Sequence, residues 1–347
     1  MPRKETESVR PLVDKVGFAH NPKQMETFLE RMRQQQGELL ETKRAAHNIT
    51  KNTRWRVALC PHDDYTYTGY LYPLVLQQVK SKTIFIIAVA HKAAMFNLEN
   101  KLIFDDYTCW HGIHKPVPVS HLRAELLQRI EGSMREVHRP MQQTEHSVEA
   151  MLPFIQYYNP GAEIVPVLVP FMPFEKIQTL AEALSSAIHE IAFEHKLSWG
   201  NDFSILITTD SVHYGDEGWN GKNCDRFGTG KAGYNETLAY EYSIIDECLE
   251  GEITEEKVRS FYNYMVDPHD FHKYKWTWCG RYAVPLGLLT SLELAKKLKE
   301  PIPQGAFLDY STSIAHQPIP VTDLEGMGTT ADANLRHWVG YTAMGYV

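Results

Sequence analysis

The sequence predicts an α/β fold: a single three-layer domain with a central, mainly parallel or mixed sheet covered by helices. Apolar runs such as "IFIIAVA" alternate along the chain with longer amphipathic segments, and strands that are apolar throughout are typical of a sheet buried on both faces. The 347 residues are 43% hydrophobic and 22% charged, which is enough for a large core. We therefore expect one domain over residues 1–347, with residues 1–50 as an N-terminal extension and a helix packed on it.

The expected elements follow in order from the spacing of apolar residues. The first is an amphipathic helix over 21–46, with these candidate buried positions: Met25, Phe28, Leu29, Met32, Leu39 and Leu40. Short apolar runs predict strands at 55–60, 83–90, 101–105, 162–169, 203–209, 305–310 and 339–347. Longer segments predict helices at 70–80, 120–131, 146–158, 173–197, 232–250, 254–266 and 281–299. The stretch 216–233 is rich in glycine and polar residues and predicts a long loop near a mouth or lid.

Charge and composition argue against several classes of protein. The net charge is −8 and no run of Lys and Arg stands out, so we expect neither nucleic acid nor a membrane surface as a partner. The longest apolar run is too short to span a bilayer, and the first residues lack the apolar segment of a signal peptide. Five scattered cysteines without a CxxC pair indicate free thiols in a reducing cytoplasm. The oligomeric state stays open.

Polar side chains follow three of the predicted strands. His62 comes after "WRVAL", His91 after "TIFIIAVA", and Asp210 and His213 after "FSILITT". Ligands of open α/β sheets bind at the carboxyl ends of the strands, where the loops converge. Because such side chains need partners when they are buried, three occurrences at one edge predict a site there.

Two further segments add candidate ligands. The stretch "EHSVEAMLPF" places Glu145, His146 and Glu149 at a helix start, and Cys279 comes just before an apolar helix. We expect the helix dipole to lower the pKa of Cys279 towards the thiolate that ligates metals. Imidazoles with a thiolate suit Fe(II), Cu or Zn better than Mg or Ca. Each residue alone has a structural explanation, such as a satisfied turn histidine, a small buried cysteine or a helix cap, but together they favour a metal site.

Two other segments also have the spacing of metal ligands. They are "CWHGIH" at 109–114 and "HDFH" at 269–272, and neither follows a predicted buried strand. We interpret their histidines as loop or helix-surface residues and expect them to lie outside the pocket.

The stretch "PHDDYTYTG" raises the question of what holds its histidine. A ligating imidazole usually donates its second N–H to a carboxylate or carbonyl. We expect at most one of Asp63 and Asp64 to serve the site, and the other to be solvated or to cap the helix at 70–80. Tyr65 and Tyr67 share one side of an extended segment, and we expect them to line the pocket wall.

These segments, in this order, resemble the MEMO family, the protein-B component of the AmmeMemoRadiSam group, which is related in fold to class III extradiol (LigB-type) dioxygenases. "PHDDYTYTG" corresponds to the family pattern PHAGYxYSG, with Asp63 and Asp64 in place of Ala-Gly. "EHSVEAMLPF" and the CGR element at 279–281 are intact, "TTDSVHYG" corresponds to SSDxxHYG, and "VAHK" keeps only His91 of a GPxH element. The resemblance runs from about residue 55 to the end, where "VGYTAMGY" looks like the family's C-terminal strand.

The resemblance implies a LigB/MEMO-like fold and metal ligation by His62, His91 and Cys279. It also implies that Asp210 and His213 line the same pocket, as candidate catalytic residues together with His146, which lies close by. Extradiol enzymes hold iron with two histidines and one carboxylate. Here a cysteine takes the place of the carboxylate, which argues against classical ring cleavage because a thiolate changes the redox properties of the metal and is itself oxidisable.

Three functions compete at this point. The first is a metal-dependent oxidoreductase for a small-molecule substrate, with Fe(II) as the favoured cofactor, Cu or Zn as alternatives, and His213 or His146 moving protons. The second is a non-catalytic protein that binds a peptide or phosphopeptide in the same pocket. The third is a hydrolase in which zinc-bound water attacks and Asp210 is the base.

Overall fold

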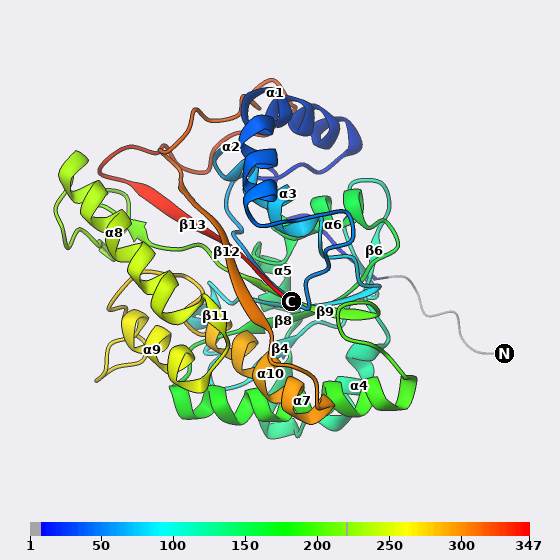
Figure 1. Cartoon of the computed structure of the whole chain (residues 1–347). Coiled ribbons are helices and arrows are strands. Elements are labelled where there is room, and N and C mark those ends of the chain that lie inside the picture. The colour runs from blue at the N-terminus through cyan, green and yellow to red at the C-terminus, as the bar shows by residue number, and fades with distance from the viewer. Residues whose placement is uncertain (1–7, 220) are drawn as a thin grey trace.

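The computed structural model describes residues 8–219 and 221–347 and has the three layers that the sequence predicts (Figure 1). The main sheet has ten strands. They run in the order β11 (Gly251–Glu252), β12 (Gln304–Thr312), β13 (Trp338–Tyr346), β2 (Val57–Cys60), β9 (Phe203–Thr208), β3 (Thr83–Val89), β8 (Glu163–Val169), β4 (Leu102–Phe104) and β7 (Arg135–Val137), and β10 (His213–Tyr214) pairs with β13.

The sheet is mixed, and its centre is parallel. Strands β2, β9, β3 and β8 run parallel to their neighbours in this group, whereas β13 is antiparallel to both β2 and β12. Every residue of β2, β3 and β9 is buried, as expected for strands that are apolar throughout. The parallel centre brings the carboxyl ends of β2, β3 and β9 to one edge.

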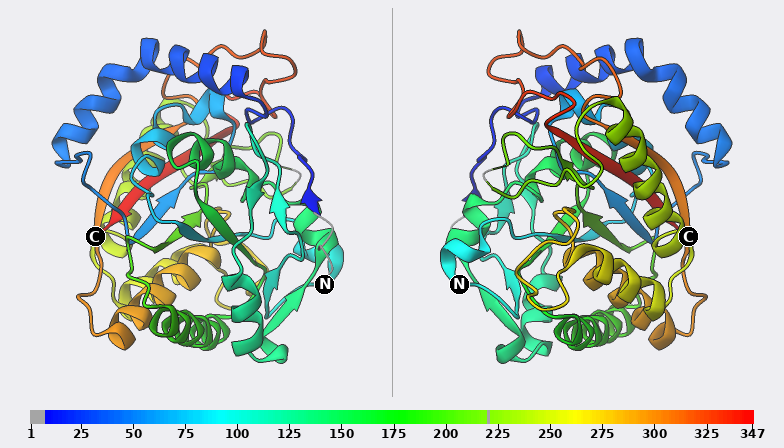
Figure 2. Two further views of the ribbon diagram at one scale, coloured as in Figure 1. Left: turned by 90° about the vertical axis from the view of Figure 1, so that its right-hand side faces the viewer. Right: turned by 90° about the vertical axis from the view of Figure 1, so that its left-hand side faces the viewer.

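Helices cover both faces of the sheet. One face packs against α4 (Leu122–Arg129), α7 (Phe174–His195), α8 (Lys231–Cys248), α9 (Glu255–Met265) and α10 (Ala283–Leu298). The other face packs against α1 (Pro22–Ala46), α2 (Tyr65–Thr68), α3 (Leu71–Leu76), α5 (Arg139–Thr144) and α6 (Leu152–Tyr158). Figure 2 shows α1 on one side of the strands and α7 with α10 on the other. The predicted fold class is therefore confirmed.

The first helix shows why these residues form a helix here. The Asn21 side chain accepts a hydrogen bond from the Gln24 N–H at 3.0 Å, and Pro22 takes the first helical position, so the start is capped. Lys43 and Arg44 in the last turn complement the helix dipole. All of the candidate buried positions are buried except Leu39, which is half-buried.

Several short elements carry no pattern that a sequence could reveal. Strands β1 (Val9–Arg10), β5 (Cys109–Trp110) and β6 (Val117–Pro118) form a separate small sheet, and none is longer than two residues. The helix expected at 146–158 starts later, as a 3-10 turn over Glu149–Met151 that leads into α6. The helix expected at 70–80 covers only α3.

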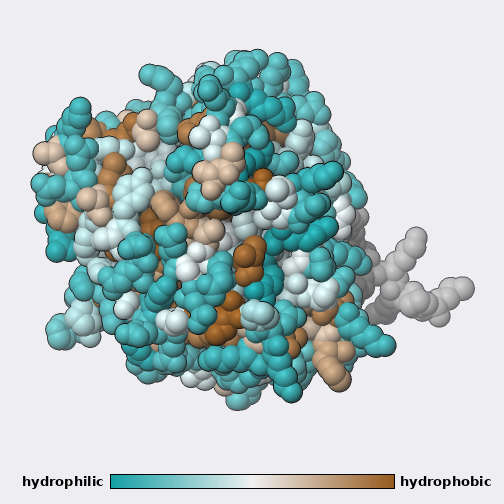
Figure 3. Space-filling view, viewed as in Figure 1, coloured by the Kyte–Doolittle hydropathy of each residue, from teal (hydrophilic) through white to brown (hydrophobic). Residues whose placement is uncertain are grey.

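The surface is mostly hydrophilic on the face drawn in Figure 3, with apolar residues scattered among polar ones. None of the helices within residues 8–219 and 221–347 combines the length and apolar character that a membrane span requires. The thiols of Cys60, Cys224, Cys248 and Cys279 are free and buried.

Candidate metal centre

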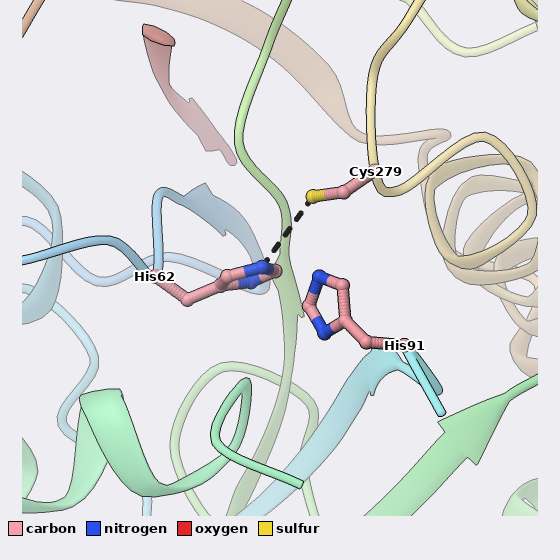
Figure 4. Close-up of side chains that lie close together, drawn as sticks. All are labelled: His62, His91 and Cys279. Carbon is pink, nitrogen blue, oxygen red and sulfur yellow. Dashed lines mark hydrogen bonds between the residues drawn. The ribbon is translucent and has the colours of Figure 1, made fainter. Parts of the chain in front are cut away.

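Three side chains from three separate elements converge at the carboxyl edge of the sheet. His62 follows β2, His91 follows β3, and Cys279 lies shortly before α10. Figure 4 shows the three side chains pointing towards one another. Their ligand atoms all lie within 4.8 Å of each other, and Cys279 Sγ is 3.4 Å from His62 Nε2. The convergence that the sequence led us to expect is found, and metal binding itself stays a prediction.

Asp210 and His213 border the same point. Asp210 Oδ1 accepts a hydrogen bond from the His62 N–H at 2.9 Å, and its Oδ2 lies 3.6 Å from His62 Nε2. One ligand atom each of Asp210, His213 and Cys279 lie within 4.8 Å of one another. Both residues can therefore contact an ion or a small molecule bound between His62 and Cys279.

His146 lies next to both His91 and His62. The two rings stack with centroids 4.7 Å apart and planes 11° apart, and His146 meets His62 edge-on at 5.7 Å. The six residues singled out in the sequence therefore form one continuous cluster.

Two residues that hold the histidines were not assigned this role from the sequence. The Thr208 hydroxyl, at the end of β9, lies 3.1 Å from His62 Nδ1. The Glu145 carboxylate lies 2.9 Å from His91 Nδ1 and accepts the His91 N–H at 2.7 Å. With Nδ1 engaged, each ring has Nε2 left for a metal, which is the arrangement that usually fixes a ligating imidazole. For Glu145 the signal was its place beside His146, whereas Thr208 gave none.

Burial lowers the pKa of three imidazoles of this cluster, those of His62, His146 and His213. Burial and the neighbouring His91 lower the pKa of His62 well below its ordinary value. The same two causes lower the pKa of His146 to about 4 and that of His213 to about 3. Burial alone would raise the pKa of Glu145, but the charge and hydrogen bond of His91 bring it below its ordinary value. Neutral imidazoles have the free lone pair that a metal needs.

We expected a helix dipole to lower the pKa of Cys279, and for the protein without a bound cation this expectation is wrong. Burial and the neighbouring Asp210 raise the pKa of this thiol well above its ordinary value. The helix dipole does not offset them, because α10 begins only at Ala283 and a dipole effect fades within one turn. The Asp210 N–H nevertheless donates to Cys279 Sγ at 3.0 Å, which stabilises negative charge on sulfur. A cation bound here would favour the thiolate further.

A buried carboxylate holds the segment that delivers Cys279. Glu241 of α8 accepts hydrogen bonds from Trp276 Nε1 at 2.6 Å and Trp278 Nε1 at 2.8 Å, and from the Tyr310 hydroxyl at 2.8 Å. These bonds tie the residues just before Cys279 to α8 and β12. The position of the thiol is therefore fixed from outside the centre.

The two remaining histidine motifs contribute no ligand to this cluster. Within the described residues, none of His111, His114, His269 and His272 belongs to a group of potential ligands. Two corrections apply. The "CW" of the first motif is itself a short buried strand, β5, although it lies in the small sheet. His272 lines the cavity beside the centre, so the second motif is not wholly outside the pocket.

That cavity has a volume of about 710 Å³ and opens beside His91 and Cys279. Lys222, from the long polar loop before α8, lies in its wall. This agrees with the expectation that the loop lies near a mouth.

The acidic pair after His62 has structural roles. Asp63 accepts hydrogen bonds from the Tyr341 hydroxyl at 2.6 Å and the Asp64 N–H at 2.7 Å. Asp64 accepts the Thr330 N–H at 2.6 Å and is buried, whereas Asp63 is partly exposed. The hydrogen bonds of the His62 N–H and Nδ1 go to Asp210 and Thr208 and not to this pair.

The tyrosines of the same stretch do not line the pocket. They lie in the helical turn α2 and not in an extended segment, so the expected shared side is lost. Tyr65 is buried and donates to the Ala150 carbonyl, whereas the Tyr67 hydroxyl donates to the Ala331 carbonyl at the surface.

The donor set fits a borderline-soft metal ion. Two donor atoms 3.4 Å apart, as in His62 and Cys279, can both lie about 2.0–2.3 Å from one ion. In addition, His213 Nε2 is buried without a hydrogen-bond partner, and a buried polar atom without a partner costs free energy. Two imidazoles, a thiolate and such a nitrogen suit Fe, Cu or Zn.

Comparison with known proteins gives consistent matches. The family model described as "Memo-like protein" matches residues 17–320. A MEMO1 family protein of Methanothermobacter thermautotrophicus is 26% identical over 165 residues, which cover 46% of this chain and 55% of the relative. A MEMO1 family protein of Pyrobaculum arsenaticum is 28% identical over 158 residues, covering 44% of this chain and 52% of the relative. The chain thus spans about half the length of these curated relatives in the matched region.

Proposed function

The chain belongs to the Memo-like protein family, and from that premise we propose that it is a metal-dependent oxidoreductase acting on a small substrate. In this proposal His62, His91 and Cys279 hold one ion, with Fe(II) favoured and Cu or Zn as alternatives. The observation that carries the proposal is the meeting of these three ligand atoms within 4.8 Å, beside a cavity.

The chain's own residues have distinct roles in this proposal. The bound ion would supply electron transfer and polarise the substrate. Thr208 and Glu145 hold the two imidazoles, because each lies within hydrogen-bond distance of an Nδ1 atom. His213 and His146 are neutral at neutral pH and accept or return protons of the substrate.

The test is elemental analysis of protein purified without oxygen. We expect about one ion per chain in the wild type, and loss of most of it in His62→Ala, His91→Ala and Cys279→Ser, because each variant removes one of three ligands. Matched controls are His269→Ala, an exposed histidine, and Cys248→Ala, a buried free thiol of α8. Both controls should keep the metal.

Oxygen uptake by the loaded protein then separates the alternatives. Iron or copper with oxygen uptake supports the oxidoreductase. Zinc without redox activity supports the hydrolase. An unchanged metal content in all three ligand variants overturns the proposed centre and leaves a binding protein.

A further inference from the structure

The cavity beside the metal centre is built mainly from apolar and aromatic side chains. Residues that follow β3, the last residue of β8 with those after it, and the segment before α10 supply these walls: Ala94, Leu98, Val169, Pro170, Phe171 and Tyr282. His91 and Cys279 close one side, so a molecule in the cavity would lie against the centre. Such walls favour a ligand with an apolar body.

Arg281 brings a positive charge into this apolar cavity. Arg281 is 2% exposed and lines the cavity. Nη2 donates to the His272 carbonyl at 2.9 Å, whereas Nη1 is buried and has no hydrogen-bond partner. Within residues 8–219 and 221–347 no carboxylate forms an ion pair with it. Glu99 also lines the cavity but is paired with His272 at 3.0 Å.

Arg10, the other fully buried arginine of the described residues, has a carboxylate partner, and so does the partly buried Arg123. Arg10 pairs with Glu149, and Arg123 pairs with Asp105 at 2.6 Å. Burying a charge without such a partner is costly.

Around Arg281 the only compensation within the described residues, besides one carbonyl, is aromatic. The guanidinium carbon lies 3.5 Å from the centroid of the Tyr274 ring, 4.8 Å from that of Tyr282 and 5.6 Å from that of Phe171. Ring faces orient a guanidinium by cation–π attraction, but they leave the Nη1 hydrogens without an acceptor. An incoming anion would supply it.

We propose that Arg281 is the anion-binding residue of the substrate cavity, and that the substrate is a small carboxylic acid with an aromatic or similarly apolar body. The carboxylate accepts from Nη1, which suits the planar guanidinium, and the body lies against the apolar walls, with its far end beside His91 and Cys279. This inference deepens the proposed function and rests on it only for the chemistry after binding, because binding through Arg281 needs no metal.

The test is binding of benzoate to the full chain by calorimetry. Two probes separate the parts of the proposal: benzamide has the same body without the charge, and acetate has the charge without the body. We expect benzoate to bind at least about tenfold more tightly than either, and Arg281→Gln to weaken benzoate binding by about tenfold or more. The control is Arg226→Gln, an exposed arginine that also lies over aromatic rings, those of Phe227 and Tyr240.

Further variants keep the test decisive. If Arg281→Gln does not fold, Ala94→Trp fills the cavity from an exposed lining position and should abolish benzoate binding. His62→Ala, whose residue does not line the cavity, should still bind benzoate even if metal is lost, so failure of the metal centre remains distinguishable. Equal affinity for benzoate and benzamide, or unchanged benzoate affinity in Arg281→Gln or Ala94→Trp, overturns the proposal. If acetate binds as tightly as benzoate, the proposal that the substrate has an apolar body is wrong.

Discussion

At the residue scale, the centre depends on hydrogen-bond partners that are not themselves among its three proposed ligands. Thr208 holds His62 and Glu145 holds His91, in each case at Nδ1. Both partners are buried and come from different elements than the histidines they hold. The geometry of the centre is therefore set by the packing of the sheet edge.

This gives a first prediction. Thr208→Val keeps the shape of the side chain but removes the hydroxyl, and we expect metal affinity to fall by about 10- to 100-fold because the ring of His62 loses its orientation. A matched control is Thr290→Val, since the Thr290 hydroxyl is buried in α10 without a hydrogen-bond partner. Titration with Co²⁺, followed by its absorption, measures both variants. Equal affinity of the two variants would contradict the role of Thr208.

A second prediction concerns Asp63, which accepts a hydrogen bond from Tyr341, whereas the His62 ring has Thr208 as its Nδ1 partner. Asp63→Ala should cost about 1–3 kcal/mol of unfolding free energy, because the buried Tyr341 hydroxyl loses its acceptor. Metal affinity should stay within about twofold of the wild type, since second-shell losses cost about tenfold or more.

Urea unfolding of Asp63→Ala, Tyr341→Phe and the double variant measures the coupling of the pair. We expect the double variant to lose less stability than the two single variants added together. A tenfold loss of metal affinity in Asp63→Ala would instead make Asp63 part of the centre.

At the scale of elements, the segment before α10 is held at two points, by the buried carboxylate of Glu241 and by the close packing of Gly280. Glu241 fixes Trp276 and Trp278, and the Gly280 N–H donates to the Thr209 hydroxyl at 2.9 Å. A Cβ at Gly280 would collide with the Thr209 side chain. Cys279 lies between these two anchors.

The third prediction follows from this close approach. Gly280→Ala should lower stability by about 1–3 kcal/mol through overpacking and should weaken metal binding, because the adjacent Cys279 must move. Gly132→Ala is the control, since a Cβ there would meet nothing within 4 Å. Thermal unfolding and metal titration measure both. Unchanged metal affinity in Gly280→Ala would show that this anchor does not position the thiol.

A fourth prediction concerns the contact of α1 with the loop before β13. Arg31 binds both carboxylate oxygens of Asp323 at 2.6 Å, and this hydrogen bonding lowers the pKa of Asp323 from 3.8 to about 2. A carboxyl whose pKa is lowered on folding stabilises the fold above its ordinary pKa. The contribution is lost as pH falls from about 4 to about 2.

Hydrogen exchange of residues 320–327 tests this contact. Asp323→Asn should speed exchange at about pH 6 and leave it equal to the wild type at about pH 1, below the pKa of Asp323, where the wild-type carboxyl is protonated. Glu325→Gln is the control, because Glu325 contacts α1 through its carbonyl, which accepts from Gln24. Faster exchange in Asp323→Asn at both pH values would contradict the ion pair as the cause.

At the scale of the whole molecule, the fold was predictable wherever apolar residues repeat over several turns or a full strand. Each predicted strand of the sheet is found, because β3, β8 and β9 are buried on both faces. Strands of two residues, such as β10 and β11, have no such pattern, because their partners alone define them.

The same division applies to the centre. His62 and His91 could be placed together because both follow parallel strands. Thr208 could not be assigned to His62, because that contact depends on the register of β2 against β9, where Cys60 pairs with Thr208. The sequence predicts an extended segment at Tyr65 and Tyr67, whereas the packed structure has a helical turn there.

The position of β13 has a consequence for the order in which the molecule assembles. This strand lies between β12 and β2. Its residue Met344, near the C-terminus, pairs with Leu59, which lies far earlier in the sequence. Contacts of such large sequence separation close slowly, so β2 presents an unpaired edge until β13 docks. His213 pairs with Val339 of the same strand. We therefore expect the side of the centre formed by His213 to take its final position only when β13 docks, late in the folding of a nascent or refolding chain.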